Sequence, residues 1–555
     1  MSDTKRLRSM AGTIKESFKE QTVDWGDLPT DLWRLIVSFV GEFVINDLVS
    51  TGFVGALIPF RKVLINGPTN KLPILLSNCP SIDFIAFNKV SFDIPCSFKS
   101  NTRHPLKELD LSKAHLGPKE VADVLGAVKE TCRVQSLILC GNTVDSSGVQ
   151  TIVDMVKDGL EMLDVSNTKL GREGAIALVR TIPQSLVSLN LAGNNLCSET
   201  GQALWQTLRD NQTLEHLDLS GNKLGCQGIR EVLMSNPVLQ SLDLAATGID
   251  QDGCCQIGEA LKRNISLKSL NLSRNNIGPE GGQTIGKALG VNQSLEYVDL
   301  SRCNLGVLGG VAIGKSLACN HSLKTLLLVR NELTLEGLGA LSGSLASDSS
   351  LEFLDLSLNN IGAKGGEAIA KALKSNNKLR TLHLAHACIS TEGGVAFGDA
   401  LKKNTCLNRL SLYHNSIGPE GGVLLGEALQ VNTSLKSVDL SCNKFGSVGG
   451  KAIGQAVREN RTLEILDLSS NDLGHEGTCS IMDCLASNNS LKTLHMARNK
   501  INHKSAAAIG TCLEKSKSLK TINLENNEIS TDAARAIRAA FKKSTSLKEI
   551  NLAFN

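Results

Sequence analysis

The sequence predicts an α/β solenoid, a curved stack of strand–helix units with parallel strands on the concave face and helices on the convex face. Three observations predict this fold class. The chain has 555 residues, a length at which one hydrophobic core no longer grows, so several domains or a repeat array are expected. A segment that begins at Leu267 returns along the chain at a fixed period. Each copy has the pattern of a strand, a turn and a helix.

The period is 28 residues in the second half of the chain, as from Leu267 to Leu295. The opening leucine of the unit recurs at Leu295, Leu323, Leu351, Leu379, Leu407, Leu435, Leu463, Leu491, Leu519 and Leu547. The same frame begins upstream, in steps of 25 to 28, at Leu106, Val134, Leu160, Leu186, Leu214 and Leu239. We therefore predict about 17 repeats over residues 106–555. The last is incomplete at Asn555, so we expect either a truncated end or one that a partner covers.

The strand of each repeat is predicted from residues that alternate between two sides. In the repeat that begins at Leu267, Leu270 and Leu272 are two positions apart and point inward, while Asn271 points outward. The outward positions are therefore the ones at which a partner could be contacted.

The helix of each repeat is predicted from its start signal and its apolar spacing. Pro279 suits the first turn of a helix, and Glu280 suits its positively polarised end. Ile285, Ala288 and Leu289 then follow at helical spacing and form a face toward the core.

The stack must bend because its two faces have different natural spacings. Paired strands lie about 4.8 Å apart, whereas helices are about 10 Å wide. The strands therefore line a concave face, and recurrent glycines such as Gly281, Gly282 and Gly286 are expected to let the outer helices approach closely.

The consensus of the unit resembles the leucine-rich-repeat family. The pattern L-x-x-L-x-L-x-x-N-x-L stands here as Leu267, Leu270, Leu272, Asn275 and Ile277. The 28-residue period with one helix per repeat is similar to the ribonuclease-inhibitor-like subfamily, a shape also found in NOD-like receptors and Ran GTPase activators. Over residues 106–555 this resemblance implies a right-handed curved solenoid (horseshoe).

The ninth position of the repeat is usually Asn, as at Asn275. A buried amide there is expected to satisfy loop backbone groups that lack a ladder partner, which is a structural role. Where another residue replaces it, we expect a turn that is held less firmly; these positions are Ala114, Thr168, Thr247, Cys303 and Ala387.

Three segments precede the repeats. Residues 1–20 are predicted to be a disordered tail, residues 24–59 a small α-helical segment, and residues 60–105 degenerate N-terminal repeats or a cap. The helical segment resembles an F-box, whose L-P-x-x-L-x-x-x-I-x-x-x-h opening (h is an apolar residue) stands here as Leu28, Pro29, Leu32, Ile36 and Val40. The resemblance implies that these five residues bind a Skp-type adaptor of an SCF-type ubiquitin ligase. The alternative is that this region is only an N-terminal cap over the first repeat.

Candidate partner-binding residues are those that depart from the Asp and Ser background of the outward strand positions. They are Arg274, Tyr297, Arg302, Arg330, Phe353, His383, His386, Arg409, Tyr413 and His414. The three arginines at 274, 302 and 330 occupy equivalent positions in consecutive repeats and are expected to form a column. Like charges in a column repel, which an acidic or phosphorylated protein segment would relieve. The alternative is a solvated face balanced by Asp243, Asp299 and Asp355 nearby.

Charge and cysteine content limit the other partners. Lys and Arg number 58 against 55 Asp and Glu, a net charge of +3, so neither nucleic acid nor a membrane surface is expected. There is no apolar run of membrane-spanning length and no secretory signal, which predicts the cytoplasm, with the nucleus as the alternative compartment. The 16 cysteines are then expected to be reduced.

No motif predicts an enzyme, a metal or a cofactor. His383 and Cys388 point to opposite sides of a strand, so one tight metal site is hard to build. The leading functional hypothesis is the substrate-recognition subunit of an SCF-type ubiquitin ligase. The alternatives are a non-enzymatic scaffold or sensor like the repeat domains of NOD-like receptors or ciliary proteins, and a Ran-type GTPase activator.

Overall fold

The computed structural model describes residues 62–66, 84–88 and 106–555, apart from residues 183, 227 and 348–349. It divides into two compact units, Met1–Asn195 and Leu196–Asn555, here called unit 1 and unit 2. The predicted tail at 1–20 and the F-box-like segment at 24–59 lie outside the described residues.

Unit 1 is built from short parallel strands that alternate with helices from β3 onward. Its strands are β1 (Lys62–Asn66), β2 (Phe84–Asn88), β3 (Glu108–Lys113), β4 (Ser136–Ile138), β5 (Met162–Asp164) and β6 (Ser188–Asn190). Its helices are α5 (Pro118–Thr131), α6 (Ser146–Lys157) and α7 (Gly171–Val179). Each strand pairs in parallel with the next one along the chain. β1 and β2 lie inside the segment for which degenerate repeats are predicted.

Unit 2 repeats the same strand–helix order. Its strands are β7 (His216–Asp218), β8 (Ser241–Asp243), β9 (Ser269–Asn271), β10 (Tyr297–Asp299), β11 (Thr325–Leu327), β12 (Phe353–Asp355), β13 (Thr381–His383), β14 (Arg409–Ser411), β15 (Ser437–Asp439), β16 (Ile465–Asp467), β17 (Thr493–His495), β18 (Thr521–Asn523) and β19 (Glu549–Asn551).

The helices of unit 2 are α8 (Ser198–Asp210), α9 (Ile229–Ser235), α10 (Gln251–Leu261), α11 (Gly278–Leu289), α12 (Gly306–Ser316), α13 (Leu335–Ala346), α14 (Gly362–Leu373), α15 (Ser390–Leu401), α16 (Gly418–Val431), α17 (Gly446–Glu459), α18 (Gly474–Leu485), α19 (Ala506–Lys515) and α20 (Thr531–Lys543). A short 3-10 helix, η3 (His503–Ser505), precedes α19.

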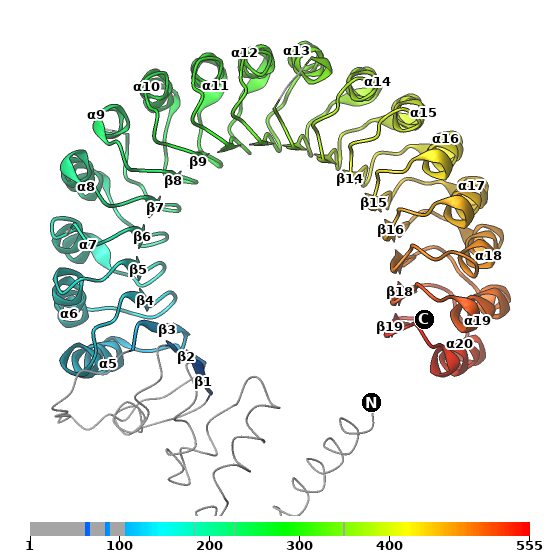
Figure 1. Cartoon of the computed structure of the whole chain (residues 1–555), viewed down its shortest axis with the longest axis horizontal. Coiled ribbons are helices and arrows are strands. Elements are labelled where there is room, and N and C mark those ends of the chain that lie inside the picture. Colours follow the sequence, from blue (N-terminus) through cyan, green and yellow to red (C-terminus); the bar gives the residue numbers. More distant parts are fainter. Residues whose placement is uncertain (1–61, 67–83, 89–105, 183, 227, 348–349) are drawn as a thin grey trace, which may run out of the picture. The chain divides into compact units, whose positions relative to one another are not determined.

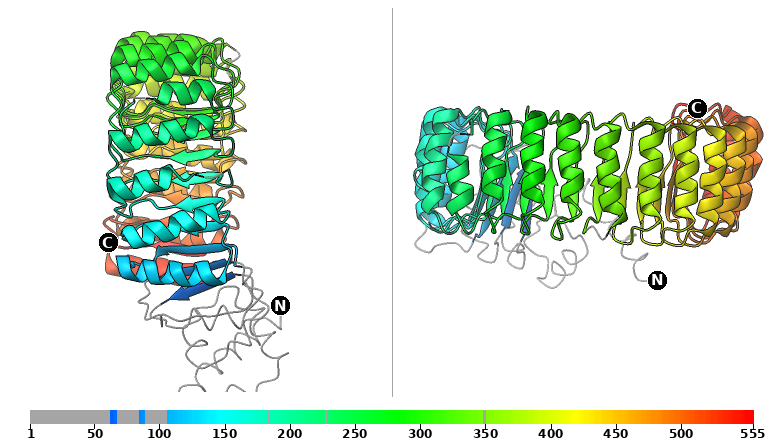
Figure 2. Two further views of the ribbon diagram at one scale, coloured as in Figure 1. Left: turned by 90° about the vertical axis from the view of Figure 1, so that its left-hand side faces the viewer. Right: turned by 90° about the horizontal axis from the view of Figure 1, so that it is seen from above.

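Consecutive strands of unit 2 pair in parallel and in one register, so that Leu270 lies beside Val298 and Val298 beside Leu326. The strands lie along the inner edge of the curved unit and the helices along its outer edge (Figure 1). The helices form one row in which neighbours lie side by side (Figure 2). The predicted fold class, a leucine-rich-repeat solenoid with parallel strands inside and helices outside, is confirmed.

The core lies between the strand layer and the helix layer. Leu270, Leu272, Ile277, Ile285 and Leu289 are all fully buried, as the alternating and helical patterns predict. Each such side chain contributes roughly 1.5–3 kcal/mol by leaving water. Among the described residues, no helix is both long enough and apolar enough to cross a lipid bilayer.

Glycines in the helices allow the close helix contacts that the sequence predicts. A Cβ atom placed on Gly286 of α11 would lie 2.7 Å from the backbone carbon of Ala312 in α12. A Cβ on Gly314 of α12 would lie 2.6 Å from the backbone nitrogen of Leu341 in α13. The helices therefore touch backbone to backbone at these points.

A ladder of buried asparagines holds the turns after the strands. The Asn443 amide donates hydrogen bonds to the carbonyls of Leu412 and Leu440, at 2.8 and 3.0 Å. Its carbonyl oxygen accepts the backbone N–H of Asn415 in the preceding repeat, at 3.0 Å. The same arrangement recurs in other repeats, for example at Asn471. The structural role predicted for position nine is confirmed.

Some of the residues that stand in place of the ninth-position asparagine keep part of its hydrogen bonding. The hydroxyls of Thr168 and Thr247 each donate to a carbonyl of their own turn at 2.7 Å, and the Cys303 thiol donates to Leu272 at 3.2 Å. A hydroxyl or thiol at this position therefore still reaches a carbonyl, and the weaker hold expected of these turns stays a prediction. Ala387 offers no such side-chain atom.

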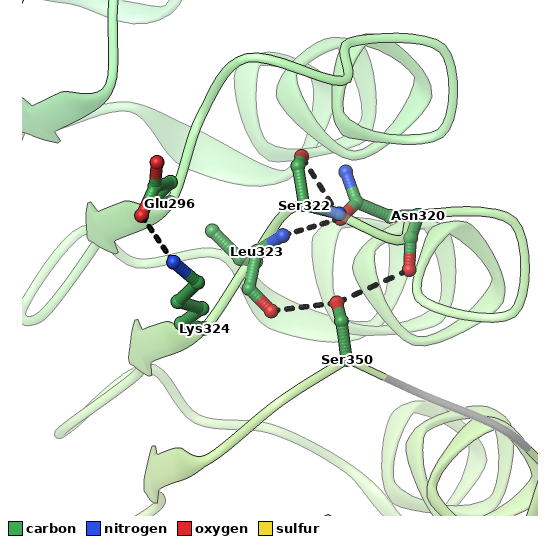
Figure 3. A network of polar contacts seen from close by, with 6 residues as sticks. All are labelled: Glu296, Asn320, Ser322, Leu323, Lys324 and Ser350. Atoms are coloured by element: carbon green, nitrogen blue, oxygen red, sulfur yellow. Dashed lines mark hydrogen bonds and ion pairs between the residues drawn. The ribbon is translucent and has the colours of Figure 1, made fainter.

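A second asparagine ladder, not predicted from the sequence, holds the segment between each helix and the next strand. The Asn320 side-chain oxygen accepts the N–H groups of Ser322 and Leu323, at 3.1 and 2.8 Å (Figure 3). The hydroxyl of Ser350, in the next repeat, donates to the Leu323 carbonyl at 2.8 Å. Lys324 and Glu296, which directly precede β11 and β10, form an ion pair at 2.6 Å (Figure 3).

Candidate protein-binding face

The candidate site lies on the strand side of unit 2 between β9 and β15, which we call the inner face. Tyr297, Phe353 and Arg409 are the first residues of β10, β12 and β14, and His383 is the last residue of β13. In these three-residue strands the middle residue is buried in the core, and the two outer residues face away from it. Tyr297, Phe353 and His383 are half-buried, and Arg409 is exposed.

The other predicted residues lie in the turns that follow the strands rather than on the strands. The eighth residue of each repeat forms what we call the turn column; in repeats 7 to 12 its members are Arg274, Arg302, Arg330, Leu358, His386 and His414. Each has a left-handed backbone, with φ between +52° and +59°. Tyr413 immediately precedes the last of them. The strand column predicted for the three arginines is therefore corrected to a turn column, because the strands end three residues earlier.

The turns of the column stack in register. The Arg274 N–H donates to the Ser301 carbonyl at 2.8 Å, and the Arg330 N–H donates to the Ser357 carbonyl at 3.0 Å. Arg302 makes the equivalent bond to Val329 at 2.7 Å. The backbone ladder thus continues past the strands, and it places one column residue from each repeat beside the next.

The three arginine side chains have no protein partner among the described residues. Neither a hydrogen bond nor an ion pair involves the guanidinium of Arg274, Arg302 or Arg330, and all three residues are exposed. The aspartates proposed to balance them hold their own turns instead. Asp299 accepts the N–H of Ser301 at 2.8 Å, and Asp243 accepts that of Ala245 at the same distance.

Burial shifts the acidity of neighbouring groups on the inner face. Burial raises the pKa of Asp243, and it also raises the pKa of Tyr297, where the charges of Asp299 and Asp243 act in the same direction. Tyr297 therefore stays protonated and can donate a hydrogen bond to a partner.

A first aromatic contact joins β12 and β13. The rings of Phe353 and His383 meet edge to face, with centroids 5.1 Å apart. The His383 Nδ1 lies 3.5 Å from the Asp355 carboxylate, and the two side chains are 36% and 18% exposed. Burial works to raise the pKa of Asp355, but hydrogen bonds from His383 and Ser357 outweigh it, and the net shift is downward.

A second aromatic cluster lies on the turns after β13 and β14. The His386 and His414 rings stack with centroids 4.1 Å apart and an interplanar angle of 27°. Tyr413 meets His386 edge to face at 4.9 Å. Burial, and then the charge of His414, lower the pKa of His386. The neighbouring Cys442 thiol and burial raise the pKa of Tyr413.

Leu358 also belongs to this face, although the sequence did not point to it. Leu358 lies in the turn column between Arg330 and His386, and it is 43% exposed. An exposed leucine is unremarkable when residues are judged one at a time. The signal that could have found it is its repeat position, which it shares with the arginines and histidines.

Other features lie elsewhere. An open hollow of about 660 Å³ lies among the helices, between α14, α15 and the start of α16, and is lined by carboxylates and lysines such as Glu367, Lys371 and Glu392. Over the part of the chain that the structure describes, no three His, Cys, Asp or Glu side chains converge in a group that could hold a metal ion.

Comparison with known proteins identifies the repeats. A family profile described as Leucine Rich repeat matches residues 210–232, 263–286, 291–314, 319–342, 347–370, 375–398, 403–426, 431–454, 459–478 and 487–510. The chain is a leucine-rich-repeat protein. Repeats of this family form protein-binding scaffolds, and the continuous strand face of unit 2 agrees with that role.

Three relatives show the breadth of the similarity. The chain is 33% identical to the pig (Sus scrofa) ribonuclease inhibitor over 133 residues, which are 23% of this chain and 29% of the inhibitor. It is 32% identical to bovine (Bos taurus) NACHT, LRR and PYD domains-containing protein 5 over 155 residues, 26% of this chain and 14% of that protein. It is 26% identical to Arabidopsis thaliana Protein TORNADO 1 over 166 residues, 26% of this chain and 12% of that protein. The similarity thus covers less than a third of each relative.

Proposed function

We propose that this leucine-rich-repeat protein captures a partner protein on the inner face of unit 2, between β9 and β15. The observation that carries the proposal is a row of three unpaired arginines beside an aromatic and histidine cluster, in a chain with only 3% aromatic residues. The pig relative is named as an inhibitor of ribonuclease, which makes protein capture a natural role for this repeat class.

The chemistry of the inner face suits a binding hot spot. Tyrosine and arginine dominate measured interface energies, most strongly where the surrounding surface excludes water. Tyr297 and Phe353 on their strands and Tyr413 in the turn after β14 are half-buried, so they lose little conformational freedom when a partner covers them. The unpaired guanidinium groups favour an acidic or phosphorylated partner, because no carboxylate of the described chain neutralises them.

The test is a quantitative purification of proteins bound to the full chain. The double variant Tyr297→Ala/Arg302→Ala should lose at least tenfold of one or more co-purifying proteins, because it removes an anchor and a charge from the inner face. The control variant Arg263→Ala/Arg458→Ala changes exposed arginines next to α10 and in α17. A set of bound proteins that is the same for wild type and both variants would contradict the proposal.

The finer role we propose is that of a substrate-recognition subunit in an SCF-type ubiquitin ligase. Its support is the F-box-like motif at Leu28, Pro29, Leu32, Ile36 and Val40, which stands directly before the repeats. In this arrangement the motif binds a Skp-type adaptor, and the inner face of unit 2 presents the captured protein to the ligase.

Co-expression of the full chain with a Skp-type adaptor tests this role. The two proteins should co-elute, and Leu32→Asp/Ile36→Asp should separate them while the repeats stay folded by circular dichroism. If the intact chain and adaptor elute separately, the ligase role is wrong, whereas protein capture by the inner face remains testable by the purification above.

A further inference from the structure

The chemistry of the turn column changes along its length. Repeats 7 to 9 contribute Arg274, Arg302 and Arg330, and repeats 10 to 12 contribute Leu358, His386 and His414. We propose that the partner presents one extended segment that lies along the turn column, with an acidic block facing the arginines and an apolar or aromatic block facing Leu358 and the histidine stack. This inference rests on the proposed function and names the chemistry of the segment that the inner face recognises.

The arginine end is the part of the column that needs negative charge. Several lysines elsewhere on unit 2 form ion pairs, as in the pairs of Lys324 with Glu296 and Lys492 with Glu464, both at 2.6 Å. The column arginines have no such partner within the described part of the chain. A segment with carboxylates at matching spacing gains charge-assisted hydrogen bonds there without first breaking any internal ion pair.

The other end of the column needs an apolar partner. Leu358 is exposed, and the stacked rings of His386 and His414 carry Tyr413 at their edge. The charged or titratable groups around this end include Asp355 and His383 on β12 and β13, Arg409 on β14, Asp439 at the end of β15, and Cys442 and Arg498 in later turns. Asp355 is paired with His383, and Asp439 accepts hydrogen bonds from Ser411 and Ser441. In the turn column itself, Leu358 and the stacked rings are the side chains that a segment meets at this end.

The length of the column matches an extended peptide. Six residues in adjacent repeats span five strand spacings of about 4.8 Å, or about 24 Å. An extended chain that rises about 3.3 Å per residue covers this length with seven or eight residues. One short segment can therefore contact both ends of the column at once.

The side chains at the column, and not its backbone, distinguish repeats 7 to 12 from the other repeats. A left-handed φ costs a non-glycine residue roughly 1 kcal/mol or more, and glycine or asparagine adopts it most readily. Repeats 2 to 5 use such residues at this position, namely Gly141, Asn167, Gly193 and Gly221, and repeat 6 uses Ala246. Repeats 7 to 12 carry large side chains in the same conformation, and the repeats after them carry Cys442, Ser470, Arg498, Asn526 and Phe554. The conformation therefore belongs to the repeat turn, and the unbroken run of large side chains is what distinguishes repeats 7 to 12.

A selection from a random 12-residue peptide library, displayed on phage and exposed to the full chain, tests the inference. Enriched peptides should contain an acidic block of three or more residues next to an apolar or aromatic block. Synthetic versions should bind at least tenfold more tightly than peptides of the same composition in which the two kinds of residue alternate.

Two sets of variants separate the ends of the column. Arg274→Gln/Arg302→Gln/Arg330→Gln should weaken binding of the enriched peptides at least tenfold, and so should His386→Ser/His414→Ser. The matched controls are Arg263→Gln/Arg458→Gln/Arg538→Gln and His321→Ser/His503→Ser, which change the same residue types at exposed positions off the inner face. The controls should bind as wild type does.

The outcomes distinguish this inference from the proposed function. Peptides that depend on the column but lack the block order, or that bind as well when alternated, overturn the inference and leave inner-face capture standing. Peptides that bind all the column variants as tightly as wild type count against both. A phosphorylated version of an enriched peptide that binds only when phosphorylated overturns the acidic block in favour of phosphate recognition. A library without any enriched peptide also overturns the inference.

Discussion

At the residue scale, the inner face depends on a few side chains whose neighbours alter their chemistry. His386 is the clearest case, because it stacks on a second histidine and touches a tyrosine edge. Burial lowers the pKa of His386, and a charge on the His414 ring, whose centroid lies 4.1 Å away, lowers it further. The lowered pKa favours the neutral form of His386.

The titration of His386 can be followed by NMR. Its pKa should lie below the ordinary histidine value, and His414→Ala should raise it by removing the neighbouring charge. Because the unfolded chain then binds more protons, this group contributes stability above the ordinary pKa that is lost as the pH falls toward the lower folded value. A His386 that titrates normally in the wild type would contradict the stacked geometry.

Ala387 is a gap in the first asparagine ladder, and filling it should stabilise the chain. In other repeats the ninth-position Asn accepts the N–H of its counterpart in the repeat before, as Asn415 does for Ala387 at 2.9 Å. Ala387→Asn would supply the same acceptor for Asn359, which should add roughly 1 kcal/mol to the unfolding free energy. Urea unfolding measures this change in the unfolding free energy, and Ala385→Asn serves as a control outside the ladder. An equal effect of both changes would argue against the ladder as the cause.

At the element scale, the helix row is held by close backbone contact at glycines. These glycines lower helix propensity but let neighbouring helices of unit 2 approach, as Gly286 does between α11 and α12. Other helix glycines have no such contact. A Cβ on Gly343 of α13 would meet nothing within 4 Å. Replacement by alanine should therefore change the stability of the chain in opposite directions at these two kinds of glycine.

Gly286→Ala should destabilise the chain by about 1–3 kcal/mol, because the new methyl group would overlap the backbone of α12. Gly343→Ala should instead stabilise it by about 0.5–1 kcal/mol, because the helix gains propensity without a clash. Thermal and urea unfolding of the two variants provide the comparison. Similar shifts of the same sign would mean that glycine packing does not set the helix spacing.

The elements of the repeats could be predicted because their pattern is physical and repeated. Alternation at Leu270 and Leu272 fixes the strand, helical spacing at Ile285 and Leu289 fixes the buried helix face, and the recurrence of Asn at position nine indicates a structural amide. The sequence does not encode the left-handed backbone of the turn column, because arginine and histidine give no local signal for it. The alternation of the strand pattern therefore places the three arginines on strands, and it gives no reason to single out Leu358.

At the scale of the whole molecule, the repeat pattern explains the fold, and the residues that differ from this pattern mark the binding face. In unit 2, parallel strand pairing and the two asparagine ladders recur through the repeats, so they explain the fold and not a particular partner. The inner face from β9 to β15 is where the background of Asp and Ser gives way to arginine, aromatic residues and histidine. Its continuity across adjacent repeats is what an elongated partner segment requires.

Hydroxyl-radical footprinting of the full chain, with and without an enriched peptide, tests the central claim most directly. The account predicts that Phe353, His386, Tyr413 and His414 become protected when the peptide binds. Exposed apolar residues on the helices, such as Leu308 and Val448, should keep their reactivity. Protection on the helices with an unchanged inner face would contradict the claim that this protein captures its partner between β9 and β15.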